Sequence, residues 1–377
     1  MIQTVALLSV FGLGIAFSVM GALKLELVKQ LRIDDVQFGK LISTLMFTCI
    51  IVVLGFGPLV DMFGYKPVAI MGYVLGFVAV FLLINARTYG MAILSCVILG
   101  IGAMCLNLGN TLIPMVLFPG NETAASNFGN VFFGVGAFIT PFLVGMLLSR
   151  MGYKFTGMVI AFILLIPVIF AVLPAYPTLQ KTGMTFTRAF AGAFGLLANP
   201  AIIVSALALF CYIGLEVSMG GWITTYASGQ GFSEKGASMI LSSFWIGLMV
   251  ARLIASQLVT PANGAMAITI LAVVAAIAIG LMIATKSRLA AAIFIILTGL
   301  SFGPIFPTIV GVTFSGIDKT LYGSAFGIIF AVGLLGGSTI PAAIGYYAKG
   351  KTIQKSLSIA VVTALALCVM AIIMGRV

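Results

Sequence analysis

Long apolar stretches separated by short polar segments run the whole length of this 377-residue chain. At 1.5 Å per residue, each stretch is long enough to cross about 30 Å of bilayer hydrocarbon as a helix. Charges and turn residues delimit twelve of them, at residues 4–28, 38–60, 67–85, 90–117, 127–149, 154–174, 199–226, 237–259, 265–285, 289–313, 321–347 and 354–375. The pattern predicts an all-α polytopic membrane protein with twelve transmembrane helices.

The composition narrows the class of protein. Hydrophobic residues make up 62% of the chain and charged residues 7%, a balance that no soluble core could use. Histidine is absent, and the five cysteines fall in predicted spans without metal-ligand spacing. We therefore expect no metal and no cofactor. The 19 Lys and Arg outnumber the 8 Asp and Glu. In a membrane protein such basic residues set the orientation in the bilayer and attract anionic lipid, so we expect no nucleic acid partner.

The longest connection divides the spans six and six. We predict an N-terminal six-helix bundle over 1–174, a linker over 175–198 and a C-terminal six-helix bundle over 199–377. The two halves resemble each other, which supports a duplicated parallel repeat. A shift of 200 places Gly136, Pro141 and Gly145 on Gly336, Pro341 and Gly345, and a shift of 197 places Gly102 and Thr111 on Gly299 and Thr308.

A short motif lies between the second and third spans. It runs from Gly57 through Asp61 and Gly64 to Lys66 and resembles the loop signature of the major facilitator superfamily, with Met62 where that family usually carries Arg. The resemblance covers essentially the whole chain. It implies two pseudo-symmetric six-helix halves, transport by alternating access, cytoplasmic termini and a gating role for this motif, in which Asp61 accepts bonds at the start of span 11.

Three segments are also similar to the fucose permease-like branch of sugar–proton symporters. They are 127–137, 212–216 with Trp222 and Tyr226 downstream, and 244–247 followed by Arg252, which we group with the gating motif. In the first span, Lys24 and Glu26 stand where that branch carries Asp or Asn. This departure bears on both hexose specificity and the coupling mechanism.

Glu216 is the main candidate for chemistry because it interrupts the apolar run 201–227. A carboxylate at bilayer depth costs about 2.5–3.5 kcal/mol on insertion scales, so it faces a cavity or a partner. Tyr212 lies one helical turn away on the same face. Two interpretations stay open: a proton-coupling and substrate-binding residue, or a carboxyl group that only joins helices by hydrogen bonds.

The remaining candidate substrate-binding residues are polar or aromatic and lie within or beside spans: Asn107, Asn110, Asn127, Asn130, Lys24, Glu26, Trp222 and Trp245. Amides suit neutral polyols but also pin helices together. Lys24 and Glu26 form either an interfacial pair or a cationic site for an anion. Trp222 is interpreted as a packing residue first and a sugar-stacking residue second. In span 10, Pro304 and Pro307 leave backbone carbonyls free.

These observations favour a secondary transporter of a small polar solute, a monosaccharide first, coupled to protons through Glu216. The alternative is an organic-anion facilitator or exchanger that uses Lys24. An enzyme is disfavoured because there is no His, no carboxylate pair on one helix and no metal spacing. The expected partners are the substrate, protons or another coupling ion and lipid, with the protein a monomer in a bacterial inner membrane. With cytoplasmic termini, 13 of the 19 Lys and Arg lie outside, against the positive-inside rule.

Overall fold

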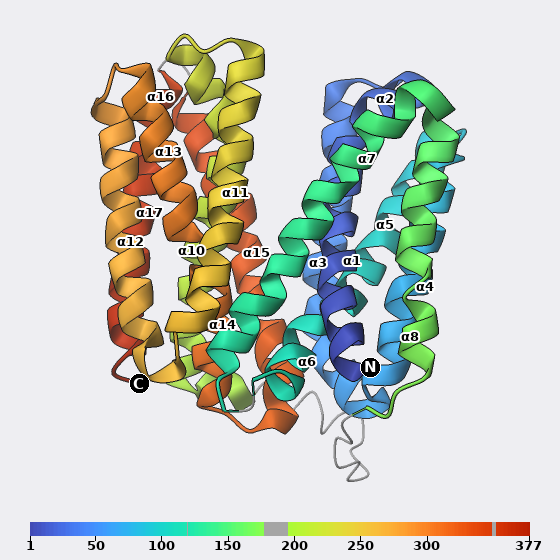
Figure 1. Cartoon of the computed structure of the whole chain (residues 1–377), viewed down its shortest axis with the longest axis horizontal. Coiled ribbons are helices and arrows are strands. Elements are labelled where there is room, and N and C mark those ends of the chain that lie inside the picture. The colour runs from blue at the N-terminus through green and yellow to red at the C-terminus, as the bar shows by residue number, and fades with distance from the viewer. Residues whose placement is uncertain (119, 177–194, 349–351) are drawn as a thin grey trace. The chain divides into compact units, whose positions relative to one another are not determined.

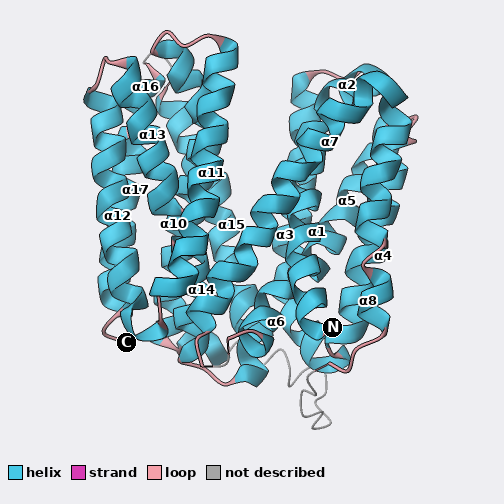
Figure 2. Ribbon diagram, viewed as in Figure 1, coloured by secondary structure: helices cyan, strands magenta, loops and turns pink. Residues whose placement is uncertain are grey.

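The computed structural model describes residues 1–118, 120–176, 195–348 and 352–377, and these ranges contain helices and loops without strands (Figure 2). Eleven helices in them are long and apolar enough to cross a membrane. One, Glu122–Val172, has 51 residues, which is enough for two crossings. The prediction of an all-α polytopic membrane protein is confirmed. Residues 177–194 of the predicted linker fall outside the described ranges.

Two compact units make up the structure (Figure 1). Unit 1 comprises Met1–Leu117, Gly129–Ala193 and Lys319–Gly327, and unit 2 comprises Phe118–Phe128, Phe194–Asp318 and Ile328–Val377. The first half of the chain forms α1 (Ile2–Ala22), α2 (Lys24–Leu31), α3 (Asp35–Phe63), α4 (Tyr65–Ile84), α5 (Tyr89–Leu106), α6 (Gly109–Val116), α7 (Glu122–Leu165) and α8 (Val168–Val172). The second half forms η1 (Leu196–Ala198), α10 (Pro200–Gly229), α11 (Glu234–Leu258), α12 (Pro261–Ala284), α13 (Arg288–Phe302), α14 (Ile305–Ser315), η2 (Lys319–Leu321), α15 (Tyr322–Tyr347), α16 (Ile353–Ser356) and α17 (Ser358–Met374).

A single glycine separates the fifth span from the sixth. Gly152 interrupts α7 with φ 78° and ψ 171°, a region of backbone space that is essentially restricted to glycine. Gly64, between α3 and α4, has nearly the same conformation, with φ 76° and ψ 172°. Tyr and Lys follow the glycine in both places. The predicted turn at Gly64 is therefore present, and an equivalent turn occurs three spans later.

Close contacts at glycine repeat between the two halves of the chain. Gly136 packs against the backbone carbonyl of Phe11, and Gly336 packs in the same way against Phe210, about 200 residues later. A Cβ at either glycine would overlap that carbonyl, so these contacts need a residue without a side chain. A second pair is offset by 199 residues, in which Gly100 lies against Thr48 and Leu45 of α3 and Gly299 lies against Phe244 of α11. Equivalent helices of the two halves thus pack through equivalent glycines.

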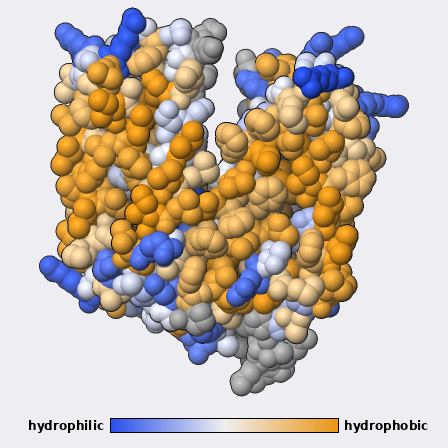
Figure 3. All heavy atoms as spheres, in the orientation of Figure 1, coloured by the Kyte–Doolittle hydropathy of each residue, from blue (hydrophilic) through white to orange (hydrophobic). Residues whose placement is uncertain are grey.

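Apolar side chains cover the middle of each unit on the face drawn in Figure 3, and hydrophilic residues gather toward its ends. Phe47 and Ile51 of α3 are 66% and 70% exposed, which suits a surface in contact with lipid rather than water. The first span is shorter than predicted, because the helix breaks at Leu23 and leaves Lys24 in the separate helix α2.

Candidate functional site

Helix α10 carries the centre of the site, which lies within unit 2. Pro200 occupies its first turn, where a missing N–H costs nothing, and the Asn199 side chain accepts a hydrogen bond from Ala201 N at 2.9 Å. The apolar sequence that follows holds the helix to Gly229. This places Glu216 near the middle of the span, far from either end.

Tyr212 and Glu216 are in direct contact, as their spacing predicts. The Tyr212 hydroxyl donates to Glu216 Oε1 at 3.0 Å. Tyr212 is fully buried, whereas the Glu216 side chain keeps 20% of its surface exposed. One carboxyl oxygen of Glu216 thus accepts the Tyr212 hydroxyl, while part of the glutamate side chain stays exposed.

Arg252 of α11 completes the cluster. Its Nη2 lies 3.5 Å from Glu216 Oε1, and its side chain is 3% exposed. Its Nε donates to the backbone oxygen of Gly303 at 2.9 Å. In an unbroken helix that oxygen would accept from residue 307, but Pro307 has no N–H. One of the carbonyls freed by the span-10 prolines is thus taken by the arginine that also pairs with Glu216.

The close approach of α11 to the α13–α14 segment makes this reach possible. Gly299 and Gly303 face the backbone of Phe244 and Leu248, and a Cβ at either glycine would overlap those carbonyls. Small residues four positions apart allow two helices in a membrane to pack this tightly. The break between α13 and α14 falls at Gly303, next to the arginine.

Aromatic rings surround the cluster. Tyr212 packs edge-on against Phe302 with ring centroids 6.0 Å apart, and tilted against Phe306 at 6.3 Å. Trp245 is 37% exposed and packs over Gly220, one turn beyond Glu216 on α10. On α11, Trp245 and Arg252 are two turns apart and share a face. An accessible carboxyl group, a buried cation and an exposed indole suit hydroxyl recognition, ring stacking and proton exchange.

Three of the four asparagines, Asn110, Asn127 and Asn130, take part in hydrogen bonds between spans, and Asn107 bonds within its own span. In unit 1, Asn130 Nδ2 donates to Asn110 Oδ1 at 3.0 Å, and Asn110 Nδ2 donates to Asn107 Oδ1 at 2.7 Å. In unit 2, Asn127 Nδ2 donates to the Thr308 hydroxyl at 3.0 Å. Asn127 and Asn130 therefore point to different partners. These bonds match the interpretation in which the amides pin helices together.

Lys24 and Glu26 lie beyond the first apolar span, in α2. The Lys24 ammonium is 5.4 Å from the ring centroid of Phe38, a cation–π distance. Both side chains are partly exposed. Their position at the end of the membrane segment favours the interfacial interpretation over a site within the bilayer.

The remaining candidates are Trp222 and the motif between α3 and α4. The Trp222 indole lies against Gly345 of α15, which supports packing as its role. In the motif between α3 and α4, Lys66 is exposed and Gly64 forms the turn. Gly57 and Asp61 lie in the last turns of α3, and the Asp61 side chain is outside the described part of the structure. The gating role of the motif and of Arg252 stays a prediction.

The pairing of Arg252 with Glu216 is the relationship that sequence reasoning missed. The sequence indicates a role for each residue separately, Glu216 in proton coupling and Arg252 in gating. The sequence does carry one signal of this pairing. A charged residue inside a span is rare and requires a partner of opposite charge. Among the described residues, no three His, Cys, Asp or Glu side chains gather closely enough to hold one metal ion.

Sequence and structure comparisons identify the family. A sequence profile described as Major Facilitator Superfamily matches residues 5–341, so the chain belongs to that superfamily. It is an integral, multi-pass membrane protein. A similar yeast protein from Saccharomyces cerevisiae, "Bypass of stop codon protein 6", is 28% identical over 68% of this chain. The "Glucose/galactose transporter" of Brucella abortus is 26% identical over 64% of it. The aligned parts span 58% and 62% of the lengths of these two relatives.

Solved structures share the fold over almost the whole chain. FucP in its outward conformation superposes with a TM-score of 0.82 at 18% identity, covering 99% of this chain and 98% of FucP. The human organic anion transporter MFSD10 superposes with a TM-score of 0.76 at 16% identity, covering 98% of each chain. The proton:xylose symporter XylE gives 0.72 at 15% identity, covering 100% of this chain and 94% of XylE. At these identities the similarity establishes the fold alone.

Proposed function

We propose that this protein is a secondary transporter of a monosaccharide, driven by protons through Glu216 and working by alternating access. The observation that carries the proposal is the cluster of Tyr212, Glu216 and Arg252. A carboxyl group that is partly exposed at bilayer depth can bind a proton from a water-filled path and release it. The name of the Brucella relative supports a monosaccharide as the solute.

The proposed coupling follows from the bonds of Arg252. When Glu216 is ionised it attracts the guanidinium, and when it takes up a proton that attraction is lost. The guanidinium is also bonded to Gly303 at the break between α13 and α14. Protonation at Glu216 therefore changes the forces on the broken span, whose bend can then differ between the two states of the carboxyl group.

Purified protein in liposomes tests this proposal. We expect wild type to accumulate a labelled monosaccharide, from a panel beginning with glucose, galactose and fucose, when the outside is made acidic. Glu216→Gln should lose accumulation but keep exchange of solute, because Gln forms hydrogen bonds but does not titrate. Tyr226→Phe is the matched control, since this buried tyrosine of the same helix bonds to Met282 O away from the cluster. Accumulation by Glu216→Gln at the wild-type rate would contradict the role of Glu216.

An organic anion is the second candidate solute. Two cations support this candidate: Arg252, which pairs with Glu216 in the centre of the site, and Lys24, near the end of the first span. If the solute is an anion held by Lys24, Lys24→Met should weaken its binding by roughly tenfold, the loss of one charge-assisted hydrogen bond. A neutral sugar should bind this variant as well as wild type.

We further propose that the protein is a monomer with cytoplasmic termini in a bacterial inner membrane.

A further inference from the structure

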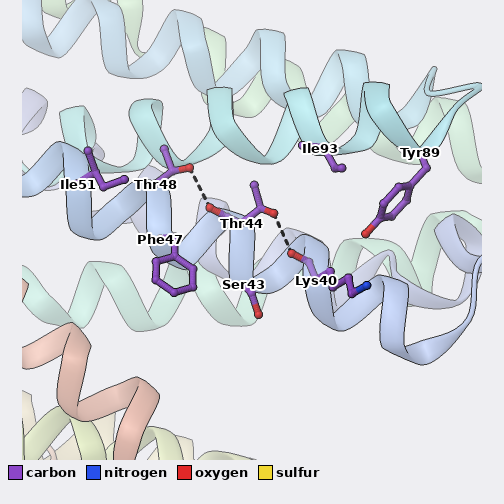
Figure 4. A pocket seen from close by; sticks show the side chains of 8 residues that line it. All are labelled: Lys40, Ser43, Thr44, Phe47, Thr48, Ile51, Tyr89 and Ile93. Atoms are coloured by element: carbon purple, nitrogen blue, oxygen red, sulfur yellow. Dashed lines mark hydrogen bonds between the residues drawn. The ribbon is translucent and has the colours of Figure 1, made fainter.

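An open groove of about 500 Å³ runs along α3 in unit 1 (Figure 4). Its walls come from α3 and α5, and its lining residues are Lys40, Ser43, Thr44, Phe47, Thr48, Ile51, Tyr89 and Ile93. Figure 4 shows Lys40 and Tyr89 at one end and Ile51 at the other. The groove thus has a cationic end and an apolar end, and it is separate from the cluster around Glu216.

The hydroxyl groups of the groove turn toward the protein backbone. Ser43 donates to Gly39 O at 3.0 Å, Thr44 to Lys40 O at 2.9 Å and Thr48 to Thr44 O at 2.8 Å. Tyr89 donates to Gln37 O at 3.0 Å. These donors are occupied by backbone oxygens, and the Thr48 methyl lies against Gly100 of α5. The apolar surface of the groove is therefore supplied chiefly by the exposed side chains of Phe47 and Ile51. A sugar, whose hydroxyl oxygens need donors, finds few here, whereas a hydrocarbon chain finds a long apolar wall.

The length of the groove matches one leaflet of a bilayer. Ile51 lies eleven positions after Lys40, which corresponds to about 16 Å along the helix. Half of the bilayer hydrocarbon is about 15 Å. Since Lys40 lies little more than one turn inside α3, its ammonium reaches the headgroup level while Ile51 lies near the bilayer centre.

Charge at the Lys40 end selects the headgroup. Lys29, Arg32, Lys40 and Arg87 are all exposed at the ends of α2, α3 and α5. The Gln30 amide donates to Ala86 O and so ties the end of α2 to the loop that precedes α5. The nearby Asp34 carboxylate caps α3 by accepting from Gln37 N at 2.7 Å. In segment 24–40 four Lys and Arg stand against the three acids Glu26, Asp34 and Asp35, and Arg87 adds a further cation. The surrounding charge is therefore positive, which attracts a negatively charged headgroup.

We propose that this groove binds an anionic phospholipid, with its phosphate at Lys40 and one acyl chain along Phe47, Thr48 and Ile51. The site is independent of the proposed transport function, because it holds a lipid of the surrounding bilayer and no transported solute. Its headgroup preference rests on Lys40, and its chain contact rests on the apolar wall.

Brominated lipids test the proposal directly. Phe47→Trp places an indole in the groove, and its fluorescence is quenched by a brominated acyl chain that occupies the site. The two native tryptophans supply a background measured with wild type in parallel. In vesicles that mix brominated phosphatidylglycerol or brominated phosphatidylcholine with unbrominated lipid, we expect phosphatidylglycerol to associate about tenfold more strongly.

In the Phe47→Trp protein, a second substitution, Lys40→Gln, should reduce the preference for phosphatidylglycerol to about onefold. Lys40→Arg should retain the preference. Lys154→Gln is the matched control, an exposed lysine of the same unit outside the groove. Equal quenching by the two lipids with Lys40 present would overturn the proposal. An absence of quenching by either lipid would also overturn the proposal. If the indole responded to monosaccharides instead, the groove would be part of a solute path and the lipid proposal would be wrong. No substrate is needed, so failure here leaves the transport proposal unaffected.

Discussion

Glu216 of α10 and Arg252 of α11 face each other, with Oε1 and Nη2 3.5 Å apart. The two residues differ in exposure, since the glutamate side chain is 20% exposed and the arginine side chain only 3%. The arginine also holds the Gly303 carbonyl at the break in the tenth span. A partly exposed glutamate is thus joined, through one buried cation, to the break between α13 and α14.

The pair should show strong energetic coupling. Removing one partner of a buried ion pair costs about 3–5 kcal/mol, because the other charge is left unpaired. Glu216→Gln should cost more than Arg252→Gln, since it leaves the more buried charge alone. The double variant should be more stable than the sum of the single variants predicts, by about 0.5–3 kcal/mol. Unfolding of the four proteins in detergent gives this cycle, and strictly additive losses would contradict the coupling.

The hydroxyl group of Tyr212 should matter for transport, beyond its contribution to stability. Tyr212→Phe removes a donor to Glu216 worth about 0.5–1.5 kcal/mol, and the partly exposed carboxyl group becomes less fixed in position. We expect slower proton-driven uptake with nearly normal melting temperature. Tyr226→Phe removes a comparable buried bond, to Met282 O, and should lower stability to a similar extent while leaving uptake intact. Equal uptake by the two variants would indicate that the Tyr212 bond is structural.

Pro307 should maintain the link between Arg252 and the broken span. Pro307→Ala restores a backbone N–H that can bond to Gly303 O in competition with Arg252. We expect a more stable protein with slower uptake, because the helix becomes more regular and the arginine loses its carbonyl. Pro261→Ala serves as the control, since Pro261 lies in the first turn of α12, where proline breaks no helical bond. Wild-type uptake by Pro307→Ala would contradict this role.

Gly152 should be required for the turn between the fifth and sixth spans. Its φ of 78° and ψ of 171° are strained for any other residue by about 1–3 kcal/mol. Gly152→Ala should therefore lower the melting temperature, and Gly64→Ala should do the same at its counterpart. Gly145→Ala, in open space on the same helix, should have little effect. Similar melting temperatures for Gly152→Ala and Gly145→Ala would show that the turn relaxes at little cost.

The sequence determined the class of fold because the bilayer imposes a strict length and polarity on each span. The apolar stretches and the glycine positions of the two halves were sufficient to predict a twelve-span helical protein with an internal repeat. The contact between Tyr212 and Glu216 could also be predicted, since residues four apart on a helix are neighbours. These are local properties, which the spacing of residues along the chain fixes.

Only the tertiary structure decided which distant residues meet. Asn127 and Asn130 lie three residues apart in one span, but packing of the helices directs one to Thr308 and the other to Asn110. Arg252 reaches the Gly303 carbonyl because Gly299 and Gly303 let α11 approach the tenth span closely, a contact between residues 51 positions apart in the chain. A buried charge must find a partner, and the sequence states that requirement. Which partner it finds depends on where the helices cross, and that is settled by side-chain packing across the whole unit.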